Sequence, residues 1–188
     1  MGSFPHYFIA IPLSSKLQDY FSNWQDELVG KLPYKQWYNK KDFHITLKFL
    51  GEVDDNKLKA LRMELEKLSL LKAFSIVVGE IGTFGNPKSP RVIWAGVEKN
   101  KNLMQLAEKV EEYATKVGFP KENRPYSPHI TLAKKWIGEK GKNDINWLEE
   151  AKEKYKETNL LRVQQVNLYQ IHPGKEQKYE PVQTIQLR

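Results

Sequence analysis

The first 50 residues alternate between strand-like and helix-like patterns of hydrophobic positions. Residues 6–12 form a short apolar run bounded by turn formers, which predicts a strand. Apolar residues then recur at helical spacing over 17–28, with Ser14 as a suitable N-cap and Gly30 as a suitable C-terminal signal. A second strand is expected over 43–50. The chain therefore begins with the order strand, helix, strand.

The rest of the chain continues this mixture of short elements. The periodic stretches predict, in chain order, a helix over 58–68, strands over 75–83 and 91–98, helices over 103–117 and 144–156, and strands over 161–172 and 179–187. Gly, Asn and Pro interrupt the pattern at 84–90, where a loop is expected. The short loops permit antiparallel pairing, and no steady βαβ alternation develops. An α+β fold is predicted.

The tetrapeptide His-Ile-Thr-Leu occurs twice, and its copies begin at His44 and His129, 85 residues apart. The same shift superimposes the strand at 91–98 on the first strand, and the third helix on the first helix. We therefore expect two pseudo-symmetric lobes, each an antiparallel sheet with helices packed outside, with the active-site cleft between them. Because no Ser/Gly-rich spacer separates the lobes, residues 1–188 are predicted to form a single bilobal domain.

Each copy of the tetrapeptide places an imidazole beside a hydroxyl. Side chains alternate along a strand, so His44 shares a face with Thr46, and His129 shares one with Thr131, while Ile and Leu point into a core. With an ordinary pKa of roughly 6.5, one histidine can accept a proton while the other donates one. The threonines can donate hydrogen bonds to phosphoryl oxygens. This pattern indicates phosphodiester chemistry that requires no metal.

Plainer interpretations exist for these and other residues. A single His-x-Thr is more often a polar patch at a sheet edge, but two copies in the same local order favour the functional interpretation. Phe84 and Trp94 are candidates for stacking on a nucleobase, although core packing is favoured for Trp94. The remaining side chains considered are His6 and His172, expected at the surface and in a turn, and Arg91 and Arg124, which either touch an RNA backbone or brace their loops.

Composition narrows the function classes further. The 188 residues are 40% hydrophobic, enough for a core, and the absence of cysteine excludes disulfides, thiol catalysis and thiolate metal sites. No apolar run approaches the roughly 20 residues of a membrane span, and no secretory signal is evident, so a cytoplasmic protein is expected. The charge of +7 modestly favours an anionic partner. Lysine clusters at 40–41, 134–135 and 140–142 could line a phosphate-bearing path.

Several segments, in order, resemble a known family. They are Phe-Ile-Ala-Ile-Pro from residue 8, His-Ile-Thr-Leu-Lys-Phe-Leu-Gly from residue 44, Arg-Val-Ile-Trp-Ala-Gly from residue 91, and Arg-Pro-Tyr-Ser-Pro-His-Ile-Thr-Leu-Ala-Lys from residue 124. The chain resembles the 2H phosphoesterase superfamily, and within it the RNA 2′,3′-cyclic phosphodiesterases once called 2′-5′ RNA ligases. The resemblance spans residues 4 to about 136, and its paired motifs are highly specific.

The resemblance implies a metal-independent hydrolase that opens RNA 2′,3′-cyclic phosphate ends to 2′-phosphates. By position, His44 would be the general acid and His129 the general base, while Thr46 and Thr131 would hold the phosphate. The near-symmetry of the two copies does not itself distinguish acid from base. The family implies no cofactor, and its partners would be RNA 3′ ends or oligonucleotides with a cyclic phosphate. A monomer without membrane contact is expected.

One position departs from the family pattern. Relatives often place Arg where this chain has Lys134, which is a point charge without the guanidinium fork. Strict alternation puts Lys134 on the face opposite His129, so a phosphate-binding role requires a bulge or a strand end.

Three alternative functions stay open for the protein as a whole. They are a 2′-5′ oligonucleotide phosphodiesterase or ligase using the same site, a non-catalytic RNA-binding module, and a metal hydrolase. The metal hydrolase is the weakest, since a third ligand is not evident.

Overall fold

The computed structural model describes residues 3–138 and 144–188, so the lysine cluster at 140–142 lies outside the described residues. The strands are β1 (His6–Pro12), β2 (Tyr34–Trp37), β3 (His44–Glu52), β4 (Phe74–Asn86), β5 (Ser89–Val97), β6 (His129–Trp136), β7 (Thr158–Val163), β8 (Gln165–Ile171) and β9 (Tyr179–Gln186). The helices are α1 (Ser15–Leu28), α2 (Asp55–Leu65), α3 (Lys101–Lys116) and α4 (Asp144–Lys154), with short 3₁₀ turns η1 (Lys40–Asp42) and η2 (Glu66–Leu70). The predicted α+β class is confirmed.

Side-chain caps begin three of the helices. Ser14, Asp54 and Asn100 each accept a hydrogen bond from the backbone N–H three residues ahead, which satisfies a donor that has no partner within the helix. Gly30 follows α1 with φ +87°, a conformation that glycine adopts without strain. Among the described helices, none combines the length and apolarity needed to span a bilayer.

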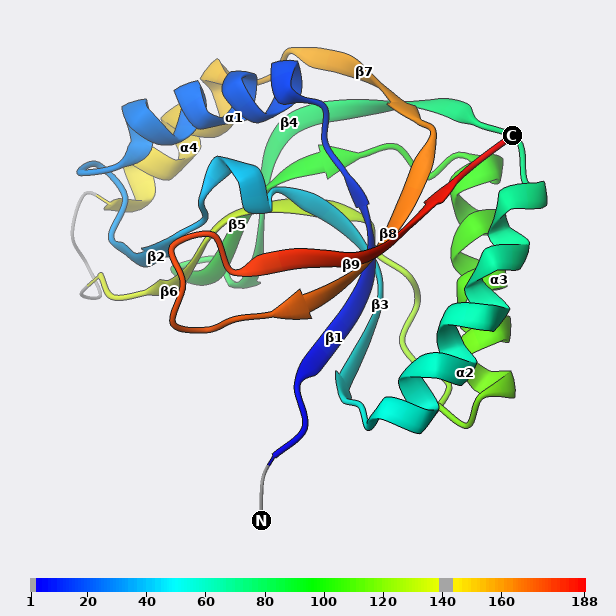
Figure 1. Ribbon diagram of the computed structural model, residues 1–188. Helices are drawn as coiled ribbons and strands as arrows, with labels where there is room; N and C mark the ends of the chain where they lie inside the picture. The colour runs from blue at the N-terminus through cyan, green and yellow to red at the C-terminus, as the bar shows by residue number, and fades with distance from the viewer. Residues whose placement is uncertain (1–2, 139–143) are drawn as a thin grey trace.

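The nine strands form one antiparallel sheet in the order β7-β4-β5-β6-β3-β1-β8-β9, with β2 added beside β6 (Figure 1). We call β3, β1, β8 and β9 the first lobe, and β6, β5, β4 and β7 the second lobe. The lobes meet through a single residue pair, Ile45 opposite Ile130. Outward from this pair, the strands related by the 85-residue shift follow in the same order, β3 then β1 in the first lobe and β6 then β5 in the second. The repeat of 85 residues therefore appears as a pseudo-twofold arrangement centred between β3 and β6.

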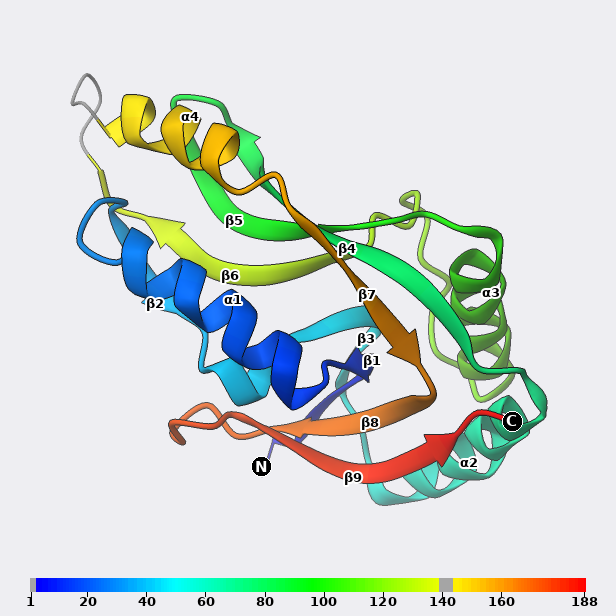
Figure 2. The same ribbon diagram turned by 90° about the horizontal axis from the view of Figure 1, so that it is seen from above.

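The helices are exchanged between the lobes. Helix α1 follows β1 of the first lobe, but its Gln25 donates to the carbonyl of Leu132 on β6 of the second lobe. Helix α3 follows β5 of the second lobe but packs against α2 and β3. Both views place α1 and α4 at one end of the molecule and α2 and α3 at the other (Figure 2). Each lobe is thus covered by a helix that belongs, in sequence, to the other.

A continuous core lies between the sheet and these helices. Its fully buried side chains come from both lobes and from three helices: Ile9, Phe21, Ile45, Leu61, Ile93, Leu103, Leu106 and Ile130. Burying each such side chain contributes roughly 1.5–3 kcal/mol of apolar transfer free energy. The core therefore fixes the positions of β3 and β6, the two strands that carry the repeated tetrapeptide.

Two predicted elements differ from the structure, and one strand was not predicted. The loop expected at 84–90 is the end of a long hairpin, in which β4 and β5 pair as far as Asn86 and Ser89. Glycine and proline misled the prediction because they occur here in a bulge and a tight turn within the ladder. The strand expected over 161–172 divides at Gln164, since β7 pairs in the second lobe and β8 in the first. Strand β2, only four residues long, was missed.

Candidate active site

The two copies of His-Ile-Thr-Leu lie on neighbouring strands. Ile45 and Ile130 are paired and fully buried, so the residues that flank them project from the opposite face of the sheet. Continuing the antiparallel register by one residue sets His44 beside Thr131 and Thr46 beside His129. All four side chains are half-buried. The structure therefore brings together the four residues that the sequence pattern singled out.

A bulge follows the threonine in each copy. The register passes from Thr46 to Lys48 on β3, and from Thr131 to Ala133 on β6, which leaves Leu47 and Leu132 as the extra residues. Each leucine and the residue after it are then buried, whereas strict alternation would expose one of the two. The sheet gains the same irregularity in both lobes, immediately beside the histidines.

The bulge at Leu132 returns Lys134 to the face of His129. Lys134 pairs directly with Val92, is half-buried, and holds its Nζ 5.4 Å from the centre of the Tyr38 ring. Its positive charge also contributes to lowering the pKa of His44, so the two side chains are close enough to interact. The structure supplies the irregularity that a phosphate-facing Lys134 requires.

Both imidazoles are held in one tautomer by the backbone. His44 Nδ1 lies 2.7 Å from the carbonyl oxygen of Asp42, and His129 Nδ1 lies 2.8 Å from that of Ser127. A carbonyl can only accept, so Nδ1 carries the proton in each ring and Nε2 is left for chemistry. His44 Nε2 lies 3.0 Å from the hydroxyl oxygen of Thr46. The repeat thus reproduces the orientation of the ring as well as its position.

Aromatic rings surround His44. Its ring centre lies 4.7 Å from that of Phe8 and 5.2 Å from that of Tyr179, which meets it edge-on. Burial lowers the pKa of His44 to about 4, although the Asp42 carbonyl works in the opposite direction, and the charges of His129 and Lys134 lower it further. At neutral pH the free protein therefore holds this imidazole uncharged.

The Asp42 side chain fastens the C-terminal hairpin over His44. Its carboxylate is buried and accepts hydrogen bonds from the backbone N–H groups of Lys178 and Tyr179, at 2.8 and 3.2 Å. Burial raises the pKa of Asp42, and these two N–H groups oppose that shift. The sequence offered no signal for this contact, because residues 42 and 178 are 136 positions apart.

Two aromatic rings support His129 from the second lobe. The Phe84 ring meets it edge-on with centres 4.8 Å apart, and the Trp94 ring centre is 6.5 Å away. Trp94 was expected in the core, but it pairs with Thr131 and lies on the site face. Gly82 permits this, since a Cβ there would come within 2.0 Å of the Trp94 ring. Burial also lowers the pKa of His129.

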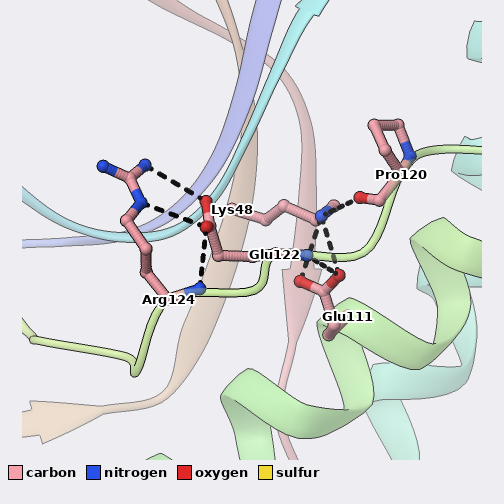
Figure 3. Close-up of polar contacts among 5 residues, drawn as sticks. All are labelled: Lys48, Glu111, Pro120, Glu122 and Arg124. Atoms are coloured by element: carbon pink, nitrogen blue, oxygen red, sulfur yellow. Dashed lines mark hydrogen bonds and ion pairs between the residues drawn. The ribbon is translucent and has the colours of Figure 1, made fainter.

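An ion-pair cluster holds the connection that leads into β6 (Figure 3). Lys48, only 7% exposed, donates to both Glu111 carboxylate oxygens at 2.9 and 3.0 Å and to the Pro120 carbonyl at 2.9 Å. Glu111 also accepts from the backbone N–H of Glu122 at 2.9 Å. The cluster ties β3 to α3 and to the connection that delivers His129. A lysine within the apolar run from Leu47 to Leu50 was the available sequence signal.

The remaining sequence candidates lie apart from this arrangement. Arg124 is highly exposed and pairs with Glu122 in its own loop, and His6 is exposed at the start of β1. His172 Nε2 contacts the Glu180 carboxylate at 2.6 Å within the β8–β9 hairpin. Tyr126, which sequence reasoning did not single out, donates its hydroxyl to the Thr46 carbonyl at 3.0 Å and so links the approach to β6 with β3. Within residues 3–138 and 144–188, no three His, Asp or Glu side chains gather as a metal ligand set.

Known proteins resemble this chain along nearly its whole length. The family described as an AKAP7 2′5′ RNA ligase-like domain matches residues 5–187. A protein of Bacillus subtilis (strain 168) named RNA 2′,3′-cyclic phosphodiesterase is 35% identical over 185 residues, which cover 97% of each chain. A crystal structure of E. coli LigT complexed with 3′-AMP has the same fold, with a TM-score of 0.75 at 24% identity over 97% of this chain and 98% of that one.

A relative in Geobacillus stearothermophilus carries the same name and differs in length. It is 33% identical over 183 residues, which cover 97% of this chain but 57% of that protein. The chain thus spans a little over half of that relative and nearly all of the Bacillus one.

Proposed function

Because this chain belongs to the 2′5′ RNA ligase-like family, we propose that it hydrolyses RNA 2′,3′-cyclic phosphate ends to 2′-phosphates without a metal ion. Two relatives that are at least 33% identical over 97% of the chain are named RNA 2′,3′-cyclic phosphodiesterase. The observation that carries the proposal is the pair of His-x-Thr units on adjacent strands, each with Nδ1 bound to the backbone. Residues 1–188 act in it as one bilobal domain.

The proposed reaction uses one proton acceptor and one proton donor. His129 Nε2 takes a proton from water as the water oxygen attacks phosphorus. The bond from phosphorus to the ribose 3′ oxygen breaks, and the protonated Nε2 of His44 gives its proton to that oxygen. The products are a 2′-phosphate and a 3′-hydroxyl. The assignment of acid and base follows the family resemblance, because the backbone hydrogen bonds of the two rings are equivalent.

The threonines and Lys134 would stabilise the charge of the phosphoryl group. Thr46 and Thr131 flank the paired isoleucines on the side of the histidines, so both hydroxyls can donate to non-bridging oxygens. Lys134, on the same face after the bulge, adds a positive charge. In this assignment the hydrogen bond between the Thr46 hydroxyl and His44 Nε2 breaks when the substrate binds, because both groups then interact with the phosphate.

Substrate binding must also charge His44. Because its pKa of about 4 lies well below neutrality, few free molecules carry this proton at pH 7. The cyclic phosphodiester is an anion, and a negative charge beside an imidazole raises its pKa. We infer that the substrate itself draws the catalytic proton onto His44, so that protonation and binding are linked.

An end-group assay in EDTA tests this function. An RNA with a 2′,3′-cyclic phosphate end should be converted to an RNA with a 2′-phosphate and a 3′-hydroxyl. A phosphatase should remove this 2′-phosphate, and the RNA end should resist periodate oxidation until the phosphate is removed. An unchanged end would refute the proposal. Loss of activity in EDTA that a divalent ion restores would favour a metal hydrolase instead. A 2′-5′-linked oligonucleotide is tested as a second substrate, and its cleavage would indicate the alternative phosphodiesterase. Binding without turnover of either substrate would indicate an RNA-binding module.

A further inference from the structure

A basic groove lies beside the candidate site on the second lobe. It has a volume of about 540 Å³ and is lined by Ser89, Arg91, Val92, Lys134, Lys135 and Trp136. Three of these six side chains are cationic and none is acidic. A groove of this composition fits a phosphate group better than a neutral or positive ligand.

The groove is continuous with the candidate site along β6. Lys134 belongs to both, since it lines the groove and its charge acts on His44. Because Leu132 is bulged, Thr131 and Lys134 pair with Trp94 and Val92, which are two residues apart, so they lie roughly 7 Å apart along the strand. One nucleotide bridges such a distance when long cationic side chains reach toward it. A nucleic acid with its end between the histidines would therefore meet the groove within one nucleotide.

Two backbone irregularities direct the outer charges into this groove. Arg91 is the extra residue of a bulge on β5, opposite Gly85, whose φ is +101°. Bulges re-aim side chains, and both Arg91 and the following Val92 line the groove. Lys135 has φ +65°, an uncommon conformation for a residue other than glycine. A regular ladder would send neighbouring residues to opposite faces, whereas Lys134 and Lys135 both line the groove.

We propose that the basic groove binds the internucleotide phosphate on the 5′ side of the terminal nucleotide, and so selects oligonucleotide ends over cyclic mononucleotides. This rests on the proposed function, in which the cyclic phosphate occupies the histidine site. An RNA 3′ end continues only in the 5′ direction, so the next phosphate along the chain is the internucleotide one. Arg91 and Lys135 are then specificity residues, remote from the bonds that change.

The test compares one substrate that has this phosphate with one that lacks it. We would measure kcat/KM for adenosine 2′,3′-cyclic phosphate and for the dinucleotide ApA with the same cyclic end. The wild-type protein should prefer the dinucleotide by about tenfold or more, the range of one or two charge-assisted hydrogen bonds. A neutral methylphosphonate linkage in the dinucleotide should abolish most of this preference.

Variants assign the preference to the groove. Arg91→Gln and Lys135→Gln should each reduce the dinucleotide preference several-fold and together remove it, while the rate on the mononucleotide stays unchanged. Arg62→Gln removes a similar charge on α2, where that residue lines a separate groove, and should change neither substrate. Equal losses on both substrates, or an unchanged preference in the double variant, would overturn the proposal.

A binding measurement separates this inference from the proposed function. Without turnover of either substrate the proposed function fails, and the affinities of ApA 2′-phosphate and adenosine 2′-phosphate still report on the groove. A preference for the dinucleotide that disappears in the double variant would support the groove as a phosphate site. Equal affinities in the wild-type protein would overturn it.

Discussion

The two histidines make equivalent backbone hydrogen bonds in different surroundings. His44 is packed among Phe8, Tyr169 and Tyr179, and a hairpin fastened by Asp42 covers it. His129 contacts the rings of Phe84 and Trp94, and the residue equivalent to Asp42 is Ser127, which contributes only its carbonyl. The repeat fixes the ring orientation, whereas the parts of the chain that are not repeated set the electrostatic environment of each ring.

This difference would allow a symmetric motif to perform the asymmetric reaction proposed above. A more enclosed imidazole is harder to charge in the free protein and responds more strongly to a bound anion, because fewer water dipoles screen the interaction. The more open imidazole is available to water. The C-terminal hairpin lies outside the repeated segments, and its contacts with Asp42 and His44 make the two half-sites unequal.

Removing either histidine should have the largest effect on activity. His44→Ala and His129→Ala are each expected to lower kcat by about 10²- to 10⁴-fold, because general acid and general base contribute separately in this range. Circular dichroism should show that both variants keep their fold. If either variant retained the full rate, the corresponding half-site would have no role in proton transfer.

The two strands should also differ in how firmly they are anchored. Lys48→Met leaves Glu111 without its cation, and we expect the free energy of unfolding to fall by about 3 kcal/mol in urea denaturation. Gln25→Leu removes the hydrogen bonds from α1 to Leu132 on β6 and to Tyr38, and it should cost about 1–2 kcal/mol. Adding Glu111→Leu to Lys48→Met should restore much of the loss. A larger cost at Gln25 than at Lys48 would contradict this order.

Releasing the hairpin should make the half-sites more alike. Asp42→Ala removes two hydrogen bonds to a buried carboxylate and should destabilise the protein by about 2 kcal/mol. It should also raise the pKa of His44 toward the ordinary value, because water gains access to the ring. The matched change Ser127→Ala keeps the carbonyl that binds His129 and should have little effect. NMR titration of the two imidazoles measures both pKa values, and an unshifted His44 would show that the hairpin does not control it.

The pH dependence should show the smallest effect, a shift of the optimum. Burial lowers the pKa of both histidines, so in the free protein each loses its proton at a lower pH than usual. The productive state has one proton on the pair, and kcat/KM should therefore reach its maximum below pH 6.5 and decline as the pH rises. The profile of kcat should lie at higher pH, because the bound anion raises the pKa of the acid. An optimum of kcat/KM above pH 8 would contradict the assignment.

Local patterns predicted the parts of the fold that depend on local physics. The bounds of β1, the cap Ser14 and the face shared by His44 and Thr46 follow from alternation and capping, which act within a few residues. The family resemblance drawn from the paired motifs is confirmed by the match over residues 5–187. The 85-residue shift correctly anticipated two related lobes, since equal sequence order implies equal pairing.

Features that depend on partners distant in sequence were missed. The bulges at Leu47 and Leu132 arise from the register with β1 and β5, so the tetrapeptides alone did not indicate them. Trp94 was assigned to the core because its neighbours are apolar, but its face follows from pairing with Thr131, and its space from Gly82. Without knowledge of the pairing, neither a bulge nor the face that follows it is predictable.

The exchange of α1 and α3 also bears on how such a molecule could arise and fold. A half-length chain with one strand–helix–strand unit would leave its sheet bare and its helix without a surface to cover. Two such chains that exchanged helices would cover both sheets and give each helix a packing surface, which is domain swapping. When the two halves are joined in one polypeptide, the exchanged helices require contacts between residues far apart in sequence before either lobe is complete. Folding should therefore be slow and cooperative across both lobes.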